Sequence, residues 1–451
     1  MIPIVEAMRK YSAEIESVFC TPGHKQGIGA HEELKKLVTA EGLREEVSLS
    51  EIENFIPQAE RLAAEVFGAE EIIFSVNGTT AAVQAMILST VKPGDLVLVA
   101  RNFHKSVMSG IILAGAIPIY LPVEFSQELK IPLNLFSETV AAAIKKYPTA
   151  RALILTTPNY YGVAADIKKI SELVHEKNIL LLVDEAHGAH LKFDSRLPIS
   201  AIEAGADLVA QSTHKTLGAL TQSSMLLVKK SFADKARQVM RLLQTTSPNN
   251  LLLASLDLAR LQVDSVSRAV DLSKKIRAEI KTFDSIKNFD LDLTKITVNV
   301  EDLNLTGYEA EKILREKLFV QCEMSDLSNL LFIISYADTE ETISKLLAAL
   351  KKLSAYKKIS AEKIFVENPA RKISIAKISP REIFFTESEY IEIKKSVGRI
   401  CAQEITIYPP GIPIINIGEE ITAEIVEYII ANKNLGGRVT GLENNFIKVV
   451  R

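Results

Sequence analysis

The sequence is poor in cysteine: only Cys20, Cys322 and Cys401 occur, far apart along the chain. They form no CxxC or Cys/His spacing, so no metal site is expected and the thiols should be reduced. No run of about eighteen uncharged apolar residues occurs, and the N-terminus lacks a basic region followed by an apolar one. These absences argue against a membrane-spanning helix and a secretory signal, and a cytoplasmic protein is expected.

The chain also has little net charge. Its 451 residues include 53 basic and 56 acidic side chains, which gives a formal net charge of −3. A protein with so small an overall field is not expected to bind nucleic acid or an anionic membrane, and small-molecule partners are favoured. The length allows several domains, and there is no internal repeat or low-complexity tract.

Lys215 lies in a short polar interruption, Ser212 to Thr216, between the apolar runs 207–210 and 225–228. A lysine held against buried strands is costly as an ammonium ion, so its pKa falls and it becomes available as an amine nucleophile. The alternative is an ordinary loop lysine with a solvated head.

Asp184 ends the continuous apolar run 179–183. Such a run is typical of a buried parallel strand, and functional groups collect just beyond the carboxyl ends of these strands. Asp184 followed by Lys215 is the order expected if the acid contacts a pyridinium nitrogen and the lysine holds the aldehyde of pyridoxal phosphate. A helix N-cap is the alternative role for Asp184.

Two further strand ends carry polar residues. Gly78, Thr79 and Thr80 follow the run 72–76, and a glycine with threonines at a helix start can form an anion site suited to a phosphate. The alternative is a threonine-capped helix that binds nothing. His104 follows the run 96–99, where it could stack on an aromatic cofactor ring or serve as a cap.

Strand and helix patterns alternate from residue 72 to residue 228. This alternation predicts right-handed crossovers and a mostly parallel sheet with helices on both faces, which is an α/β fold. Beyond it, helical patterns at 232–243 and 251–281 precede a smaller α/β region. That region includes a capping box from Thr306 to Glu309 and a helix at 338–353.

Seven motifs together resemble the Orn/Lys/Arg decarboxylase family of fold type I pyridoxal-phosphate enzymes, in its short bacterial form. In chain order they are NGTT, RNFHKS, TTPNYYGVAADI, VDEAHGAH, STHKTLGALTQSSML, LQTTSP and YPPGIP. The resemblance covers nearly the whole chain. It implies decarboxylation of arginine, lysine or ornithine, a place in polyamine biosynthesis, and a homodimer or higher homo-oligomer with shared sites.

The resemblance also implies roles for individual residues. Lys215 would bind the cofactor aldehyde, Asp184 would pair with the pyridine nitrogen, and His104 would stack on the ring. The phosphate would be held by Gly78, Thr79, Thr80, Ser212 and His214, while Ala186 and His187 would line the ring and its phenolic oxygen. The implied organisation is an N-terminal segment 1–60, a cofactor-binding large domain 61–285, a small α/β domain 286–353, a charged linker at 354–369, and a C-terminal domain 371–451.

Glu404 precedes the turn Tyr408-Pro409-Pro410-Gly411, whose prolines and glycine fix an extended conformation. In the family the acid at this place lies near the distal cation of the substrate. A solvated glutamate on an edge strand is the alternative.

The chain departs from the family pattern at three places. The segment 42–57 is shortened, Asn249 and Asn250 stand where an aromatic residue commonly follows, and Leu227 stands where a histidine is common. These differences leave the cofactor residues intact and bear on which basic amino acid is the substrate. Two other functions remain open: an aminotransferase or lyase on the same fold, and a catalytically silent regulatory homologue.

Overall fold

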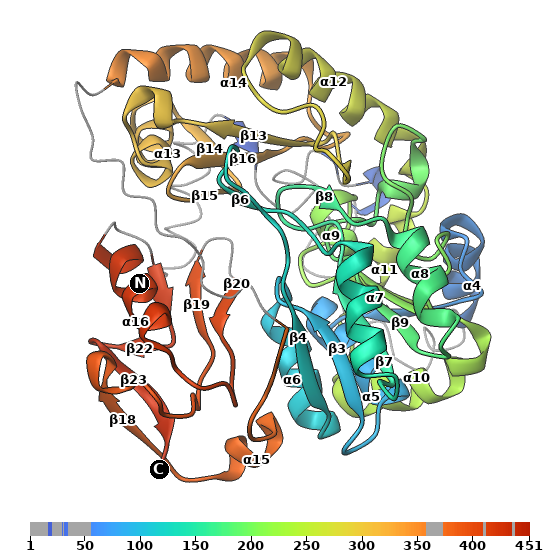
Figure 1. Cartoon of the computed structure of the whole chain (residues 1–451). Helices are drawn as coiled ribbons and strands as arrows, with labels where there is room; N and C mark the ends of the chain where they lie inside the picture. The colour runs from blue at the N-terminus through green and yellow to red at the C-terminus, as the bar shows by residue number, and fades with distance from the viewer. Residues whose placement is uncertain are drawn as a thin grey trace, which may run out of the picture.

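The computed structural model describes residues 17–19, 29, 31–34, 56–357, 373–408, 412–434 and 438–451. Figure 1 shows a large α/β unit coloured blue to yellow-green, a smaller unit above it in yellow and orange, and a C-terminal unit in red. Within the described ranges, no helix is both long and apolar enough to cross a membrane. Cys20, residues 42–55 of the shortened segment, most of the linker and the turn residues 409–411 lie outside these ranges.

The large unit is built on an eight-stranded sheet. Its order is β17 (Ser374–Ile375), β4 (Ile117–Leu121), β3 (Leu96–Ala100), β7 (Ala152–Thr156), β9 (Leu180–Asp184), β10 (Leu208–Gln211), β11 (Ser224–Val228) and β2 (Glu71–Ser75). Strands β4, β3, β7, β9 and β10 pair in parallel, whereas β11 and β17 are antiparallel to their neighbours. Because β2 is antiparallel to β11, it runs in the same direction as β10. The mostly parallel sheet expected from the sequence is confirmed.

Successive strand residues enter two different cores, one on each face of the sheet. In β3, Leu98 packs into one core while Val97 and Val99 pack into the other. A strand buried on both faces needs apolar residues at every position, which explains the unbroken apolar runs of the sequence.

Helices cover both of these faces. On the Leu98 side they are α4 (Ile56–Phe67), α7 (Ser137–Lys146), α8 (Ile167–His175) and α11 (Asn250–Ala259), and on the other side α5 (Gly78–Thr90), α6 (Lys105–Ala114) and α10 (Lys230–Leu243). Short ladders join β5 (Phe125–Ser126) to β6 (Ile131–Pro132) and β8 (Val163–Ala164) to β12 (Asp290–Leu291).

The continuous helical pattern expected over 251–281 is wrong. The chain forms α11, a 3-10 turn at Val263–Ser265 and then α12 (Val266–Glu279). At the break the Gln262 side chain donates to the carbonyl of Gly29 and accepts from the Tyr336 hydroxyl. These tertiary contacts outweigh the helical preference of the local sequence. Asn249, one of the departures from the family pattern, caps α11 by accepting from the backbone N–H groups of Leu251 and Leu252.

The small unit combines two sheets. Strands β13 (Lys295–Asn299), β16 (Asn329–Ile333) and β15 (Met324–Ser325) form one, and β14 (Val320–Cys322) pairs in parallel with β1 (Ser17–Phe19) in the other. Helix α13 (Gly307–Lys317) begins with the expected capping box, and α14 (Glu340–Leu353) packs against the same core. A strand from the N-terminal part therefore belongs structurally to this unit.

The C-terminal unit has its own core, to which Cys401, Ile405 and Ile415 contribute. Its elements are α15 (Pro380–Phe385), β18 (Ser388–Glu392), β19 (Ile405–Tyr408), β20 (Ile412–Ile415), α16 (Ala423–Asn434), β21 (Arg438–Thr440), β22 (Leu442–Glu443) and β23 (Phe446–Val450). The strand β17 precedes these elements in the chain and pairs with β4 of the central sheet instead of joining the C-terminal unit.

A buried ion pair joins the C-terminal unit to the large unit. Arg101, just beyond β3, contacts both carboxylate oxygens of Glu419, and the exposed fractions of the two side chains are 7% and 10%. Ser374 donates to the same carboxylate at 2.7 Å and accepts from Arg101 at 2.8 Å. Asn416 donates to Glu419 from its backbone and from its side chain.

Glu419→Ala is expected to destabilise the protein by about 3–5 kcal/mol, because it leaves the Arg101 charge buried without its partner. The measurement is the shift of the denaturation midpoint. Glu420→Ala is the matched control, since the neighbouring Glu420 pairs with Lys377 at the surface and should contribute less than about 1 kcal/mol. Equal losses in both variants would contradict the buried-pair interpretation.

Candidate active site

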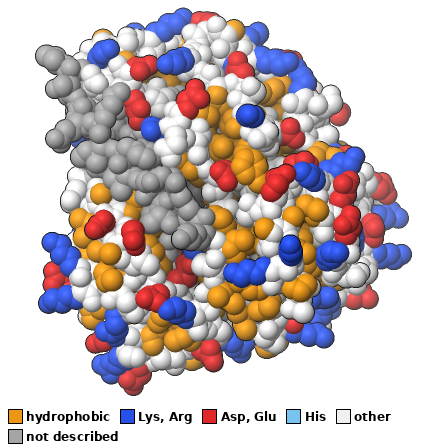
Figure 2. Space-filling view, in the orientation of Figure 1, with side chains coloured by type: hydrophobic (Ala, Val, Ile, Leu, Met, Phe, Trp, Pro, Cys, Tyr) orange, Lys and Arg blue, Asp and Glu red, His pale blue; other side chains and the backbone are white. Residues whose placement is uncertain are grey.

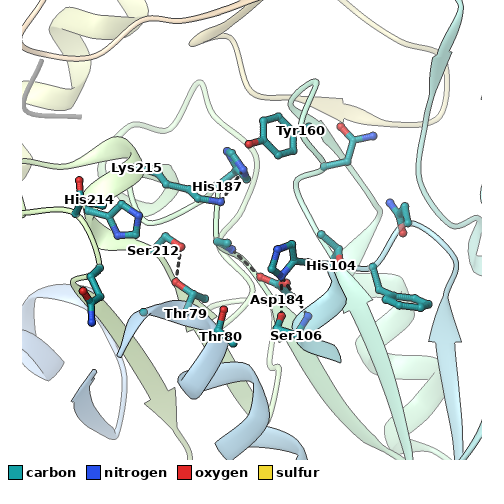
Figure 3. A pocket seen from close by; sticks show the side chains of 18 of the residues that line it. Thr79, Thr80, His104, Ser106, Tyr160, Asp184, His187, Ser212, His214 and Lys215 are labelled. Carbon is teal, nitrogen blue, oxygen red and sulfur yellow. Dashed lines mark hydrogen bonds between the residues drawn. The ribbon is translucent and has the colours of Figure 1, made fainter. Parts of the chain in front are cut away.

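A cavity of about 490 Å³ lies at the carboxyl ends of the parallel strands (Figure 3). The sheet brings these ends together: Asp184 at the end of β9 stands in register with Thr156 of β7 and Ala210 of β10. All the residues expected to hold a cofactor line this cavity. They are Gly78, Thr79, Thr80, His104, Asp184, Ala186, His187, Ser212, His214 and Lys215.

Lys215 lies in the short helix α9 (Thr213–Thr216) that follows β10. Its Nζ atom lies 3.0 Å from Nε2 of His187 and faces the cavity, so the alternative of a solvated loop lysine is wrong. Burial lowers the pKa of Lys215, while the negative charges of Asp184 and Glu323 oppose that shift. Burial also lowers the pKa of His187 well below its usual value, with the Lys215 charge acting in the same direction. A neutral His187 can therefore accept a hydrogen bond from Lys215 at Nε2.

Asp184 ends β9 without starting a helix, so the N-cap alternative is also wrong. Its side chain accepts from the backbone N–H of Ala186 at 3.1 Å and borders the cavity. Burial raises its pKa, while the Lys215 charge and the Ala186 N–H oppose the rise. The neighbouring Glu185 faces away, accepting from the Ala201 backbone and from Gln211. Of the two consecutive acids, Asp184 is the one that meets the cavity.

The start of helix α5 forms the polar end of the cavity. Gly78 has φ of +74°, a conformation that side chains rarely adopt, and it opens the helix toward the cavity. The Asn77 side chain makes no cap hydrogen bond and donates instead to the carbonyl of Leu243. The first-turn N–H groups thus have no side-chain cap and can bind an anion.

Hydroxyl groups gather beside this helix start. The Thr79 hydroxyl contacts the hydroxyl of Ser212, the N-cap residue of α9 (Figure 3), and lies 2.9 Å from that of Ser224, so Thr79 links α5 to the start of α9 and to β11. Nδ1 of His214 lies 2.8 Å from the carbonyl of Ser223, which fixes the ring at the cavity wall. The arrangement combines backbone and hydroxyl donors in the way that phosphate sites require.

His104 fills one of the two roles that the sequence left open, that of a helix cap, and it also lines the cavity. Its Nδ1 atom accepts from the backbone N–H of Ser106, which caps α6, and its ring remains accessible from the cavity. Burial, together with the charges of Lys215 and Lys105, lowers the pKa of His104 to about 4. At neutral pH the ring is uncharged and suited to stacking on an aromatic group.

Glu404 is not among the described residues that line the cavity. It is half-buried, accepts from the Thr406 hydroxyl at 3.0 Å, and has its pKa raised by burial. The charge of Lys105, next to His104, opposes this rise. The alternative of a solvated glutamate on an edge strand is wrong, because Glu404 is half-buried and β19, which begins at the next residue, is the middle strand of its sheet.

Several cavity residues were missed by the sequence analysis. Tyr160 is the most prominent, with its ring centroid 4.3 Å from that of His187 and 5.7 Å from Nζ of Lys215. Asn102 and Thr156 also line the wall. Asn102 lies in the motif RNFHKS and Tyr160 in TTPNYYGVAADI, two of the motifs on which the family resemblance rests. Their place in these motifs could have indicated that they belong to the site.

The chemistry of the cavity fits pyridoxal phosphate. Its wall contains buried polar atoms with no hydrogen-bond partner among the described residues: the amide of Asn102, the hydroxyl of Thr156 and Nδ1 of His187. A cation next to Asp184 would stabilise its ionised form, and the uncapped start of α5 would accept a phosphate. The Lys215 amine thus suits the aldehyde of this cofactor, Asp184 its ring nitrogen, the His104 ring its aromatic face, and the start of α5 its phosphate.

Comparisons with known proteins agree with this geometry. A family model described as Orn/Lys/Arg decarboxylase, major domain, matches residues 2–299, and the C-terminal domain model of the same family matches residues 358–449. The chain is 38% identical over a 477-residue alignment to the arginine decarboxylase of Bacillus anthracis, covering 100% of this chain and 96% of the relative.

Solved structures show the same fold. The constitutive lysine decarboxylase of E. coli superposes with a TM-score of 0.75 at 18% identity, covering 100% of this chain and 82% of the other. Ureidoglycine-glyoxylate aminotransferase of Bacillus subtilis gives a TM-score of 0.60 at 14% identity, covering 77% and 94%. Because both reaction classes share the architecture, these structural likenesses alone do not choose between them.

Proposed function

The chain belongs to the Orn/Lys/Arg decarboxylase family, and we propose that its own substrate is arginine. The family consists of pyridoxal-phosphate-dependent enzymes, and the chain is a decarboxylase of a basic amino acid. The observation that carries the choice of arginine is the full-length similarity to a relative named arginine decarboxylase.

In this proposal the cofactor occupies the cavity. Lys215 would hold its aldehyde, Asp184 its ring nitrogen and His104 one face of its ring, with Ala186 and His187 beside the ring and its phenolic oxygen. Gly78, Thr79, Thr80, Ser212 and His214 would hold the phosphate. When bound, pyridoxal phosphate accepts the electron pair left on the α-carbon as carbon dioxide departs.

Asp184, Lys215 and His104 set the charges and protonation states around the cofactor position. Asp184, ionised next to a ring cation, favours the protonated ring nitrogen in a site of low dielectric constant. Nζ of Lys215 can donate a hydrogen bond to Nε2 of the neutral His187 over 3.0 Å, and the low pKa of His187 disfavours transfer of the proton to the histidine. The low pKa of His104 keeps this ring neutral, so it adds no positive charge opposite Asp184.

Glu404 is proposed to meet the distal cation of the substrate. Glu404→Gln should raise KM for arginine by roughly ten- to a hundredfold, the equivalent of a charged hydrogen bond of about 1.5–3 kcal/mol, and should leave cofactor binding nearly unchanged. Glu392→Gln is the control, because this exposed acid of the C-terminal unit pairs only with Lys395 among the ion pairs of the described residues. An unchanged KM in Glu404→Gln would remove Glu404 from the substrate site.

The test of the function is release of carbon dioxide from arginine, lysine and ornithine by the purified holoenzyme. We expect arginine to give the highest kcat/KM. A highest value with lysine or ornithine would overturn the proposed substrate. An aminotransferase would need a clamp for the α-carboxylate, usually an arginine, and among the described residues no arginine lines the cavity. A silent homologue would lack a cofactor absorbance that borohydride bleaches.

We further propose a cytoplasmic homodimer or higher homo-oligomer that acts in polyamine biosynthesis, with an N-terminal segment 1–60 and domains 61–285, 286–353 and 371–451. Support for an oligomer comes from Leu242, which is 80% exposed at the end of α10 beside the exposed Thr245 to Ser247 break. On the face shown in Figure 2, basic and acidic side chains are interspersed, as expected for a protein with small-molecule partners.

A further inference from the structure

Tyr160 connects the reactive end of the cavity to the small unit. Figure 3 shows the tyrosine above the end of Lys215 and Asp184 below it. The ring contacts His187, and its hydroxyl donates to Oε1 of Glu323 at 3.3 Å. Glu323 lies between β14 and β15, so a residue of the small unit reaches the cavity wall through this tyrosine.

The next tyrosine fixes this connection in space. The Tyr161 hydroxyl donates to Oδ2 of Asp326 at 2.5 Å, and Asp326 also accepts from the backbone N–H groups of Ser328 and Asn329 at 2.7 Å each. Tyr161 is buried and Asp326 is half-buried, and burial raises the pKa of both groups. This second pair holds the turn against the small unit, so the spacing between Tyr160 and Glu323 is set by the fold.

Glu323 differs from Asp326 because its charge acts on the cavity. Glu323 is half-buried, and together with Asp184 it is one of the two acids whose charges raise the pKa of Lys215 against the effect of burial. The amine thus lies in the field of one acid from the central sheet and one from the small unit. In a site partly shielded from water, such fields act strongly.

We propose that Glu323 is a positioning residue of the active site, which holds Tyr160 against Lys215 and His187 and adds a negative charge from the small unit to the surroundings of the lysine. The proposal rests on the proposed role of Lys215. If Glu323 has this role, the electrostatic field at Lys215 depends on how the small unit packs against the large unit.

The experiment is a pH titration of the cofactor absorbance of the purified holoenzyme, combined with kcat and KM for arginine. Glu323→Gln removes the charge, and we expect it to lower the titration midpoint by about half a pH unit or more, since a lost negative charge disfavours the protonated lysine nitrogen. Glu323→Asp keeps the charge, so its titration midpoint should lie close to that of the parent enzyme. Tyr160→Phe keeps the ring and removes the hydroxyl, so it should lower kcat several-fold.

The double variant tests the link between the two residues. If Glu323 acts through Tyr160, the kcat losses of Glu323→Gln and Tyr160→Phe should be clearly less than multiplicative. Glu316→Gln is the matched control, because Glu316 is an exposed acid of the same unit that contacts only Arg315 among the ion pairs of the described residues. A midpoint in Glu323→Gln equal to that of Glu316→Gln, or fully multiplicative losses, would overturn the proposal.

Failure of the Lys215 assignment has a different signature. If Lys215→Ala still shows the titrating absorbance of the parent, Lys215 is not the cofactor lysine, and the proposed function fails at that residue. A parent titration that disappears in Lys215→Ala but is unaffected by Glu323→Gln rejects the role of Glu323 alone.

Discussion

Lys215→Ala is expected to abolish covalent attachment of the cofactor and to reduce decarboxylation by several orders of magnitude. The amine is the only group on α9 that faces the cavity with a nucleophilic nitrogen on a flexible chain, and it contacts His187 at 3.0 Å. Its pKa is lowered by burial, which makes the reactive unprotonated form accessible. The measurements are carbon dioxide release and borohydride-fixed cofactor on the peptide that contains residue 215.

The same substitution should not harm the fold. A buried lysine is desolvated at a cost, so the cofactor-free alanine variant is expected to be at least as stable as the cofactor-free parent. Thermal unfolding of both proteins separates loss of chemistry from loss of structure. Lys235→Ala is the control for lysine removal, since this exposed lysine of α10 contacts Gln238. Near-parental turnover in Lys215→Ala would reject the assignment.

Asp184→Asn is expected to lower kcat by about 10²–10³, the size of effect seen when one electrostatic group is removed from an active site. The amide keeps the shape of the side chain and can still accept from the Ala186 N–H, but it cannot supply the charge that favours a protonated ring nitrogen. Steady-state kinetics with arginine as substrate measure the loss of kcat. A loss below tenfold, or about 1.4 kcal/mol of barrier, would show that the acid is structural.

Glu185→Gln is the matched control for Asp184→Asn. Glu185 is equally buried one residue later, but burial raises its pKa to about 8 and its oxygens bind Ala201 and Gln211 away from the cavity. A neutral amide replaces a group that is largely neutral at pH 7, so kcat should change little. Similar losses in both variants would point to general damage of β9.

Much of the site could be predicted because its residues lie directly after the carboxyl ends of strands. Asp184 and Lys215 come directly after apolar runs, and parallel strands bring such residues to one edge of the sheet. Residues whose position depends on the docking of separate units could not be predicted this way. Tyr160 and Glu323 are 163 positions apart in sequence, and their contact exists because the small unit packs over the turn after β7.

The helices show the same division between local and tertiary causes. The capping box of Thr306 and Glu309 was predicted because both partners are within one turn. The break after α11 was missed, since it depends on Gln262 meeting Gly29 and Tyr336 from distant parts of the chain. For Glu404 the sequence predicted an acid ahead of an extended turn, and the effect of the Lys105 charge on its pKa depends on the packing of the C-terminal unit against α6.

The short strand β17 covers part of the β4 edge of the central sheet. Ser374 and Ile375 pair with Tyr120 and Ile119, and without them β4 would present a row of open backbone donors and acceptors at the margin of a strongly apolar sheet. Exposed edges of this kind template pairing between molecules and lead to aggregation. Cleavage of the chain before residue 374 followed by loss of the C-terminal unit would therefore reduce solubility as well as activity. The C-terminal unit thus limits aggregation through the β4 edge of the sheet.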